Sequence, residues 1–228
     1  MLASFPCVSE IGISDLSQSD LTFLLPLAGI QSLGFMCGDR NHLENLTELT
    51  HFHNLHTLSI CNYRGDVHAV ETLTSLKTLS LTSCNGTFEG LNIEHLPNLQ
   101  SLKIMACFNF SHLRGMSAQH NLQHLEIELC GKLISLNWLQ SATHLQHLVL
   151  KSLSQLKNLQ GVEGLTSLQR IEVRNMNLCS GITQLMQLPH LVEAKIANCG
   201  ALPPEHIKEL EAHLQARRQS LQEETQSY

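Results

Sequence analysis

The chain has 228 residues, of which 43% are hydrophobic and 15% charged, and its formal net charge is -6. This composition predicts a folded protein with ample apolar material for a continuous core, and the acidic balance opposes nucleic-acid binding, which depends on clustered Lys and Arg. No window approaches the roughly 20 apolar residues of a membrane helix, and no basic residue precedes the short apolar run near the start, so we expect neither a membrane span nor a secretory signal.

A leucine-rich pattern recurs along almost the whole chain. The template L-x-x-L-x-L-x-x-(N or C) fits nine times, at intervals of 21 to 25 residues. Its fourth and sixth positions alternate with more polar ones, which predicts a short β-strand with one buried face in every copy. The copies, here called rungs 1 to 9, start at Val8, Ile30, Leu55, Leu76, Leu99, Leu122, Leu145, Leu168 and Leu191.

The second half of each rung carries apolar residues at every third position. One such run is Leu133, Leu136, Leu139, Ala142 and Leu145, whereas polar Gln119 interrupts the run before it. A period of three suits 3₁₀ turns or extended coil better than a regular α-helix. We therefore expect a convex side of short 3₁₀ pieces and loops, opposite a concave parallel sheet.

Runs such as "LQGVEGLTSLQRIEV" resemble the leucine-rich-repeat family, and the resemblance covers about residues 2 to 199. They are most similar to the short repeats of bacterial internalins and of phosphatase-regulatory leucine-rich-repeat proteins, although Cys often replaces the usual Asn. The resemblance implies an α/β leucine-rich-repeat solenoid of about nine rungs. It also implies that the protein binds another protein on its concave face.

The ninth template position is cysteine in four rungs: Cys84, Cys107, Cys130 and Cys199. A small side chain fits there, where the chain leaves the strand, so we expect buried thiols. The chain also lacks the Cys-rich caps of extracellular leucine-rich-repeat proteins. This pattern indicates a reducing compartment and a cytoplasmic location.

Both ends of the chain depart from the repeat. We expect a leucine-rich-repeat domain over residues 1–199, opened by a partial rung that carries Leu2 and Phe5, and a capping helix with a polar tail over residues 200–228. Gly200 and the Pro203–Pro204 pair break the pattern, and a helix is predicted from Glu205. The polar end "QSLQEETQSY" is expected to fray.

Template positions 3, 5 and 7 should point out of the concave sheet and form the binding surface. Early rungs place small neutral groups there, and later rungs place charged groups and histidines. In-register stacking predicts a column of Glu128, Lys151 and Arg174, and sets Lys103 beside Glu126. The alternative is a solvated face without a partner. The candidate protein-binding residues are Lys103, His124, Glu126, Glu128, His147, Lys151, Arg170, Glu172 and Arg174.

The sequence offers little support for an enzyme. It contains no phosphate loop, no H-E-x-x-H and no G-x-S-x-G motif, and the repeat occupies almost every residue. His124, His147 and Glu126 could together approach a divalent metal, but no fourth ligand suggests itself. We therefore predict no catalytic residue, no metal and no cofactor, and keep a metal-dependent hydrolase as a remote alternative.

The main functional hypothesis is a monomeric, non-enzymatic protein-binding module. The richness in Leu, His and Gln and the polar tail around Glu223 and Glu224 resemble leucine-rich-repeat effectors that intracellular bacteria deliver by type IV secretion. That resemblance implies a host cytosolic partner and a translocation signal in the tail. The alternative is an endogenous regulatory or scaffold subunit of a signalling enzyme.

Overall fold

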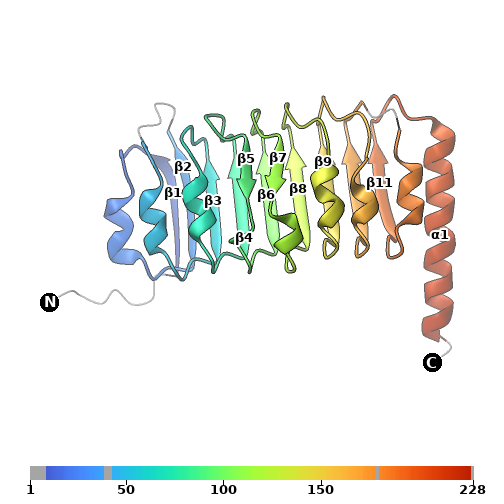
Figure 1. The fold of residues 1–228 in the computed structure, drawn as a ribbon, viewed down its shortest axis with the longest axis horizontal. Helices are drawn as coiled ribbons and strands as arrows, with labels where there is room; N and C mark the ends of the chain where they lie inside the picture. Colours follow the sequence, from blue (N-terminus) through green and yellow to red (C-terminus); the bar gives the residue numbers. More distant parts are fainter. Residues whose placement is uncertain (1–8, 39–42, 178–179, 227–228) are drawn as a thin grey trace.

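A computed structural model describes residues 9–38, 43–177 and 180–226. The chain forms a solenoid in which one nine-stranded parallel sheet lines one side (Figure 1). This arrangement confirms the predicted nine rungs, while the expected partial rung with Leu2 and Phe5 lies outside the described residues. The strands are β1 (Glu10–Leu16), β2 (Ser32–Cys37), β3 (Thr57–Cys61), β4 (Thr78–Thr82), β6 (Ser101–Met105), β8 (His124–Glu128), β9 (His147–Lys151), β10 (Arg170–Arg174) and β11 (Glu193–Ala197).

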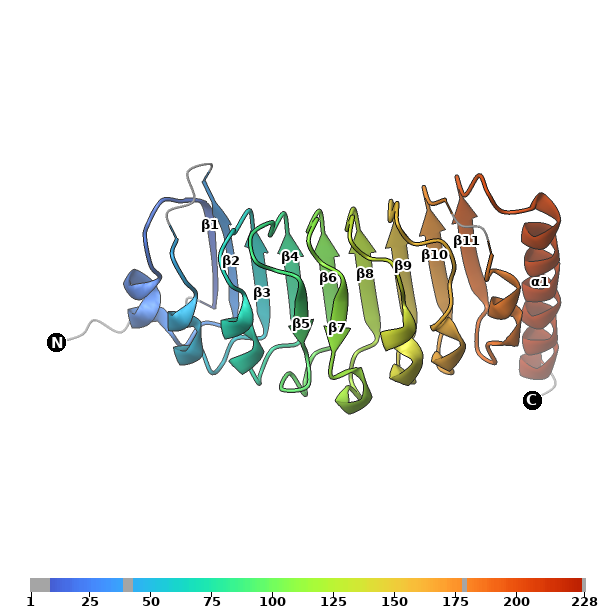
Figure 2. The same cartoon turned by 45° about the horizontal axis from the view of Figure 1, so that its top comes forward.

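Short 3₁₀ helices cover the other side of the core, as the period of three predicts (Figure 2). One region differs from the expectation of loop, because residues of rungs 4 and 5 form a second parallel sheet of β5 (Gly90–Asn92) and β7 (His112–Arg114). The two backbones approach closely there, and a Cβ on Gly90 would lie 2.8 Å from the His112 carbonyl oxygen. The 3₁₀ helices are η1 (Thr22–Leu27), η2 (Thr47–His51), η3 (His68–Thr72), η4 (Met116–Ala118), η5 (Asn137–Ser141), η6 (Val162–Gly164) and η7 (Thr183–Gln187).

The core is a set of identical apolar positions stacked in register. Leu58 pairs with Leu79, Leu79 with Leu102, and Leu102 with Leu125, and all four side chains are fully buried. Burying a leucine stabilises the fold by roughly 1.5–3 kcal/mol. One rung cannot bury its own leucines, so this stabilisation exists only when neighbouring rungs stack.

The cysteines at the ninth position lie inside the core, as predicted. The Sγ of Cys107 donates to the carbonyl oxygen of Leu81 in the preceding rung at 3.6 Å, and Cys130 makes the equivalent contact with Ile104 at 3.9 Å. Burial raises the pKa of the Cys130 thiol to about 12. The Cys130 thiol is therefore a protonated donor that ties its rung to the preceding one.

Each strand from β3 onward, apart from the short β5 and β7, is followed by a residue with left-handed backbone, at φ between 53° and 58°. Except after the last strand, the amide of this residue donates to the last carbonyl of the next strand, as from Asn62 to Thr82 at 2.9 Å and from Leu129 to Lys151 at 3.0 Å. This conformation costs a non-glycine residue roughly 1–2 kcal/mol, and the ladder of hydrogen bonds enforces it. The residues are Asn62, Ser83, Ala106, Leu129, Ser152, Asn175 and Asn198.

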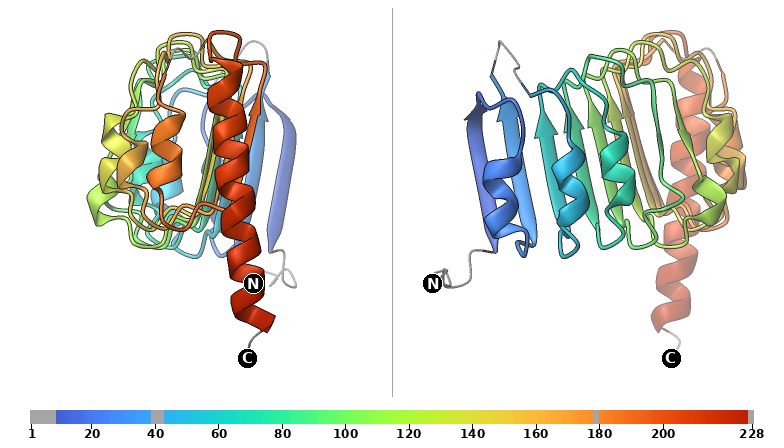
Figure 3. Two further views of the ribbon diagram at one scale, coloured as in Figure 1. Left: turned by 90° about the vertical axis from the view of Figure 1, so that its right-hand side faces the viewer. Right: turned by 60° about the vertical axis from the view of Figure 1, so that its left-hand side comes forward.

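Helix α1 (Pro204–Gln226) stands across the last rung (Figure 3). It buries Leu210 and Leu214 against the core, and the Arg217 guanidinium donates to the carbonyl oxygens of Leu188 and Leu191, at 2.9 Å for Leu191. The helix continues to Gln226, so it includes most of the segment that was expected to fray. Within the described residues, no helix combines the length and apolar character that crossing a membrane requires.

The cap makes Arg217 a testable stability determinant. Arg217→Ala should lower the free energy of unfolding by about 1–3 kcal/mol, because carbonyl groups at the last rung lose a charged donor. Chemical denaturation monitored by circular dichroism would measure this loss. Arg218→Ala is the matched control, since Arg218 is exposed; equal destabilisation by both substitutions would contradict the role of Arg217.

Candidate functional site

The concave surface from β2 to β11 divides into an uncharged and a charged half. Side chains at positions 3, 5 and 7 point outward while those at positions 4 and 6 are buried on β2 to β10, so outward-facing residues form columns across the sheet. On β2, β3 and β4 these columns hold Ser, Thr, Gly, Met and Cys. On β6 and β8 to β11 they hold the charged concave surface, defined as Lys103, His124, Glu126, Glu128, His147, Lys151, Arg170, Glu172, Arg174, Glu193 and Lys195.

Five of these residues form a continuous ion-pair network across four strands. The Glu126 carboxylate forms ion pairs with Lys103 at 3.2 Å and with Lys151 at 3.6 Å. The Glu172 carboxylate accepts from Lys151 at 3.3 Å and from Arg174 Nε at 2.8 Å. Three cations therefore share two carboxylates, and the network keeps one surplus positive charge.

The observed partners confirm part of the predicted pairing. Lys103 lies beside Glu126 and bonds to it, as expected. Glu128, Lys151 and Arg174 share one column, yet the Lys151 ammonium turns diagonally to Glu126 and Glu172. Long side chains reach diagonal neighbours across a sheet, so register alone does not determine ion-pair partners.

A second group of charges lies on the last two strands. Glu193 accepts from Arg170 Nε at 3.3 Å and from Lys195 Nζ at 2.9 Å. The hydrogen bond from Lys195 lowers the pKa of Glu193. Register also places Glu172 opposite Lys195, but the ion pair of Lys195 is with Glu193. Glu193 and Lys195 thus extend the nine candidate residues by one strand.

A shallow hollow of about 400 Å³ lies on the charged concave surface. Polar residues that include His124, His147, Arg170 and Glu193 line it, and Val149 adds an apolar side chain to the lining. Val149 holds position 5, where the two neighbouring rungs have Glu. This change from Glu to an apolar residue is the sequence feature that could have predicted the hollow. The hollow can receive a small side chain of a partner that brings both apolar and polar groups.

Burial lowers the pKa of His147, and the nearby charges of Arg170 and His124 act in the same direction. The rings of His124 and His147 lie 6.2 Å apart between centroids. Glu126, which the sequence sets beside them, is engaged by two lysines. The described part of the chain contains no group of three or more His, Cys, Asp or Glu residues arranged to hold a metal ion.

The uncharged half carries a second hollow, of about 360 Å³, which the sequence analysis missed. Gly12 and Gly34 at position 5 leave it open, and Met36, Ser59 and Cys61 line it. Glycines at position 5 of two neighbouring rungs were the sequence feature that could have predicted this hollow. The methionine is 43% exposed, so this hollow presents apolar surface without charge.

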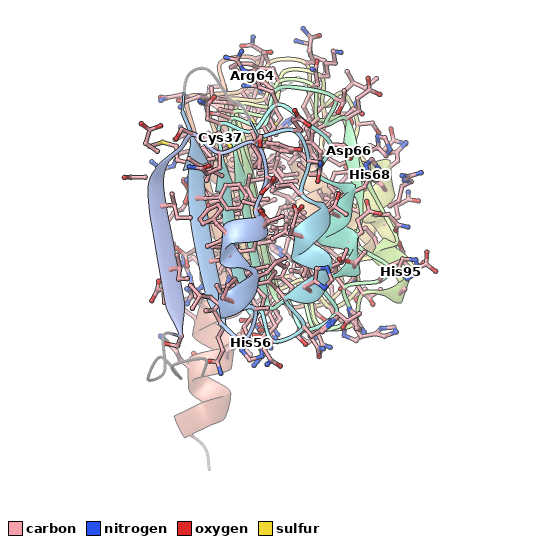
Figure 4. All side chains as sticks on the ribbon, turned by 90° about the vertical axis from the view of Figure 1, so that its left-hand side faces the viewer. Cys37, His56, Arg64, Asp66, His68 and His95 are labelled. Atoms are coloured by element: carbon pink, nitrogen blue, oxygen red, sulfur yellow. The ribbon has the colours of Figure 1, made fainter. Side chains whose placement is uncertain are left out.

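Two edges flank the concave surface. Strands enter at one edge and leave at the other, and Figure 4 shows His56 at the entry edge and Arg64 at the exit edge, seen along the solenoid from its first rungs. Asp66 and His68 follow on the flank of η3, where the two side chains contact each other. The seven non-glycine residues with left-handed backbone follow the strands at the exit edge.

Comparisons with known structures place the fold. The chain is similar to an internalin of Listeria monocytogenes, at 20% identity and a TM-score of 0.51, over 68% of this chain and 70% of that chain. It is also similar to a leucine-rich-repeat protein of Leptospira interrogans, at 21% identity and a TM-score of 0.60, over 85% of this chain and 56% of that chain. No family model and no curated protein matches the sequence.

The lowered pKa of His147 predicts a pH dependence of stability. As the pH falls through about 6.5, the unfolded chain takes up a proton on this residue before the folded chain does, so the folded state loses stability. His147→Gln should therefore make the decline of the denaturation midpoint between pH 7 and pH 5 less steep. An unchanged slope would contradict this reading. In an NMR titration, Arg170→Gln should raise the pKa of His147.

Proposed function

We propose that this chain, a solenoid with the leucine-rich-repeat fold, binds a partner protein through its charged concave surface. The observation that carries the proposal is the network in which Glu126 and Glu172 are each shared by two cations. The nine residues predicted from the sequence, with Glu193 and Lys195, are the proposed contacts.

The ion-pair network orders the charged concave surface before a partner binds. The side chains of Glu126 and Glu172 are only 15% and 23% exposed, so much of their surface is already removed from water. Shared ion pairs also hold the side chains of Lys151 and Arg174 in place, so these side chains lose less conformational entropy when a partner binds. A prearranged charge pattern of this kind favours selectivity and association rate over raw affinity.

Partner capture tests this proposal. The bait Lys151→Glu with Arg174→Glu should lose a protein that the native bait captures from cell lysate, with binding weakened at least about tenfold. The matched control is Lys208→Glu with Arg218→Glu, which makes the same change of charge on helix α1. Mass spectrometry identifies the captured protein, and circular dichroism confirms that each variant folds. Equal capture by all three baits would contradict the charged concave surface as the site.

We further propose that the chain acts as a monomer in the cytoplasm, and in a host cytosol if it is a translocated effector. The support for an effector is the compositional resemblance described above. The alternative is an endogenous regulatory or scaffold subunit, and the captured partner distinguishes the two: an effector binds a host protein, and a regulatory subunit binds a signalling enzyme of its own cell.

Translocation can be tested without knowing the partner. A reporter fused to residues 1–228 should reach the host cytosol, and one fused to residues 1–218 should not. The shorter chain keeps Leu210, Leu214 and Arg217, so the contacts of α1 with the last rung remain. Equal translocation of both fusions would remove the effector proposal and leave the regulatory one.

A further inference from the structure

Three large apolar side chains are exposed in the segments that follow β6 and β8, in the neighbouring rungs 5 and 6. Phe108 is 56% exposed, Leu129 43% and Ile134 70%. Phe108 follows β6, and Leu129 and Ile134 lie in the turn after β8. We call these three residues the exit-edge patch.

The segments that carry these residues lie side by side, because β6 pairs with β8. Gly131, between Leu129 and Ile134, lies directly beside Phe108, because a Cβ on Gly131 would be 3.8 Å from the Phe108 carbonyl oxygen. With no side chain at Gly131, the flank of Phe108 stays open. Exposed aromatic and aliphatic groups at such a position are typical of interaction surfaces.

Leu129 is the exception among the left-handed residues of the exit edge. Three of the other six are Asn, which adopts left-handed backbone readily, and three are Ser or Ala, whose side chains are small, whereas Leu129 is bulky at φ 55°. The core does not require leucine there, since the equivalent residues of other rungs are small or polar. A strained backbone that exposes an apolar side chain points to a function of that side chain.

The backbone beneath the patch is held firmly. The Phe108 amide donates to Asn85 Oδ1 at 2.8 Å, and the Leu129 amide donates to the Lys151 carbonyl oxygen at 3.0 Å. These bonds reach both neighbouring rungs. The patch is therefore preorganised, and little backbone entropy is lost when a partner binds it.

The charged residues near the exit-edge patch favour a partner with acidic residues. Lys132 is exposed in the same turn, and Lys151 and Arg174 belong to the network that keeps a surplus positive charge. Glu128 ends β8, and Lys151 lies opposite it in register. This local cationic excess contrasts with the net charge of -6 of the chain.

We propose that the exit-edge patch seats an apolar side chain of a partner segment whose flanking residues are acidic. This inference rests on the proposed function and deepens it: the apolar anchor packs on Phe108, Leu129 and Ile134, and the acidic flanks meet Lys132 and the cations of the concave network. Apolar contact supplies the anchor, and charge complementarity supplies the orientation.

A random dodecapeptide library displayed on phage, selected against the full chain, provides the probe. Enriched peptides should combine acidic residues with at least one large apolar residue. Their affinity, measured by fluorescence anisotropy, should fall about tenfold with Leu129→Asn or Phe108→Ser. Leu221→Asn is the matched control, because Leu221 is 48% exposed on α1; it should leave peptide affinity unchanged.

The melting temperature separates a binding role from a structural one. Leu129→Asn should keep or raise it, because Asn suits left-handed backbone, while peptide affinity falls. Failure to enrich peptides, enrichment of basic peptides, or equal binding by Leu129→Asn and the native chain would overturn the proposal. Peptides that lose binding with Lys151→Glu and Arg174→Glu but keep it with both patch variants would leave the proposed function intact and remove the patch. Peptides insensitive to every variant would count against both.

Discussion

In-register stacking of parallel strands is the constraint on which the rest of the molecule depends. Leu58, Leu79, Leu102 and Leu125 occupy one column, and each is buried only because the next rung covers it. The same register aligns the thiols of Cys107 and Cys130 with the carbonyl groups of the preceding rungs. Inward positions are thereby fixed in size and polarity. Outward positions carry no such restriction, so the two halves of the concave surface differ in charge while the core beneath them stays alike.

The nine strands and the 3₁₀ convex side could be predicted from the sequence because burial imposes a period of two on a strand and a period near three on the returning segment. The ion-pair partners of the side chains could not be predicted in this way. Glu128 is the register neighbour of Lys151, yet the long Lys151 side chain forms its ion pairs with Glu126 and Glu172. The pairing of β5 with β7 also escaped the pattern, because it depends on close backbone approach at Gly90. The exposure of Phe108 and Leu129 could not be predicted either, because it depends on where the chain turns after each strand.

Gln119 is a buried polar residue at a position of the repeat that is apolar in other rungs. Its amide is 3% exposed and donates to the carbonyl oxygen of Leu96 at 3.2 Å, and also to that of Ile93, both in the preceding rung. The Oε1 atom accepts no hydrogen bond from the described residues. A polar residue in an apolar column is thus retained by bonding backward along the solenoid, which is the direction in which the cysteine thiols also bond.

The spacing of the later rungs has a consequence for how such a surface can evolve. From Leu99 to Leu191 every interval is 23 residues, and the strands of these rungs pair without irregularity. A duplicated 23-residue segment in this region would meet neighbours of matching register on both sides. Each duplication would lengthen the recognition surface by one strand spacing, about 4.8 Å, and add new outward positions open to divergence. Variation in length and variation in specificity are therefore separable events in the genetic history of this architecture.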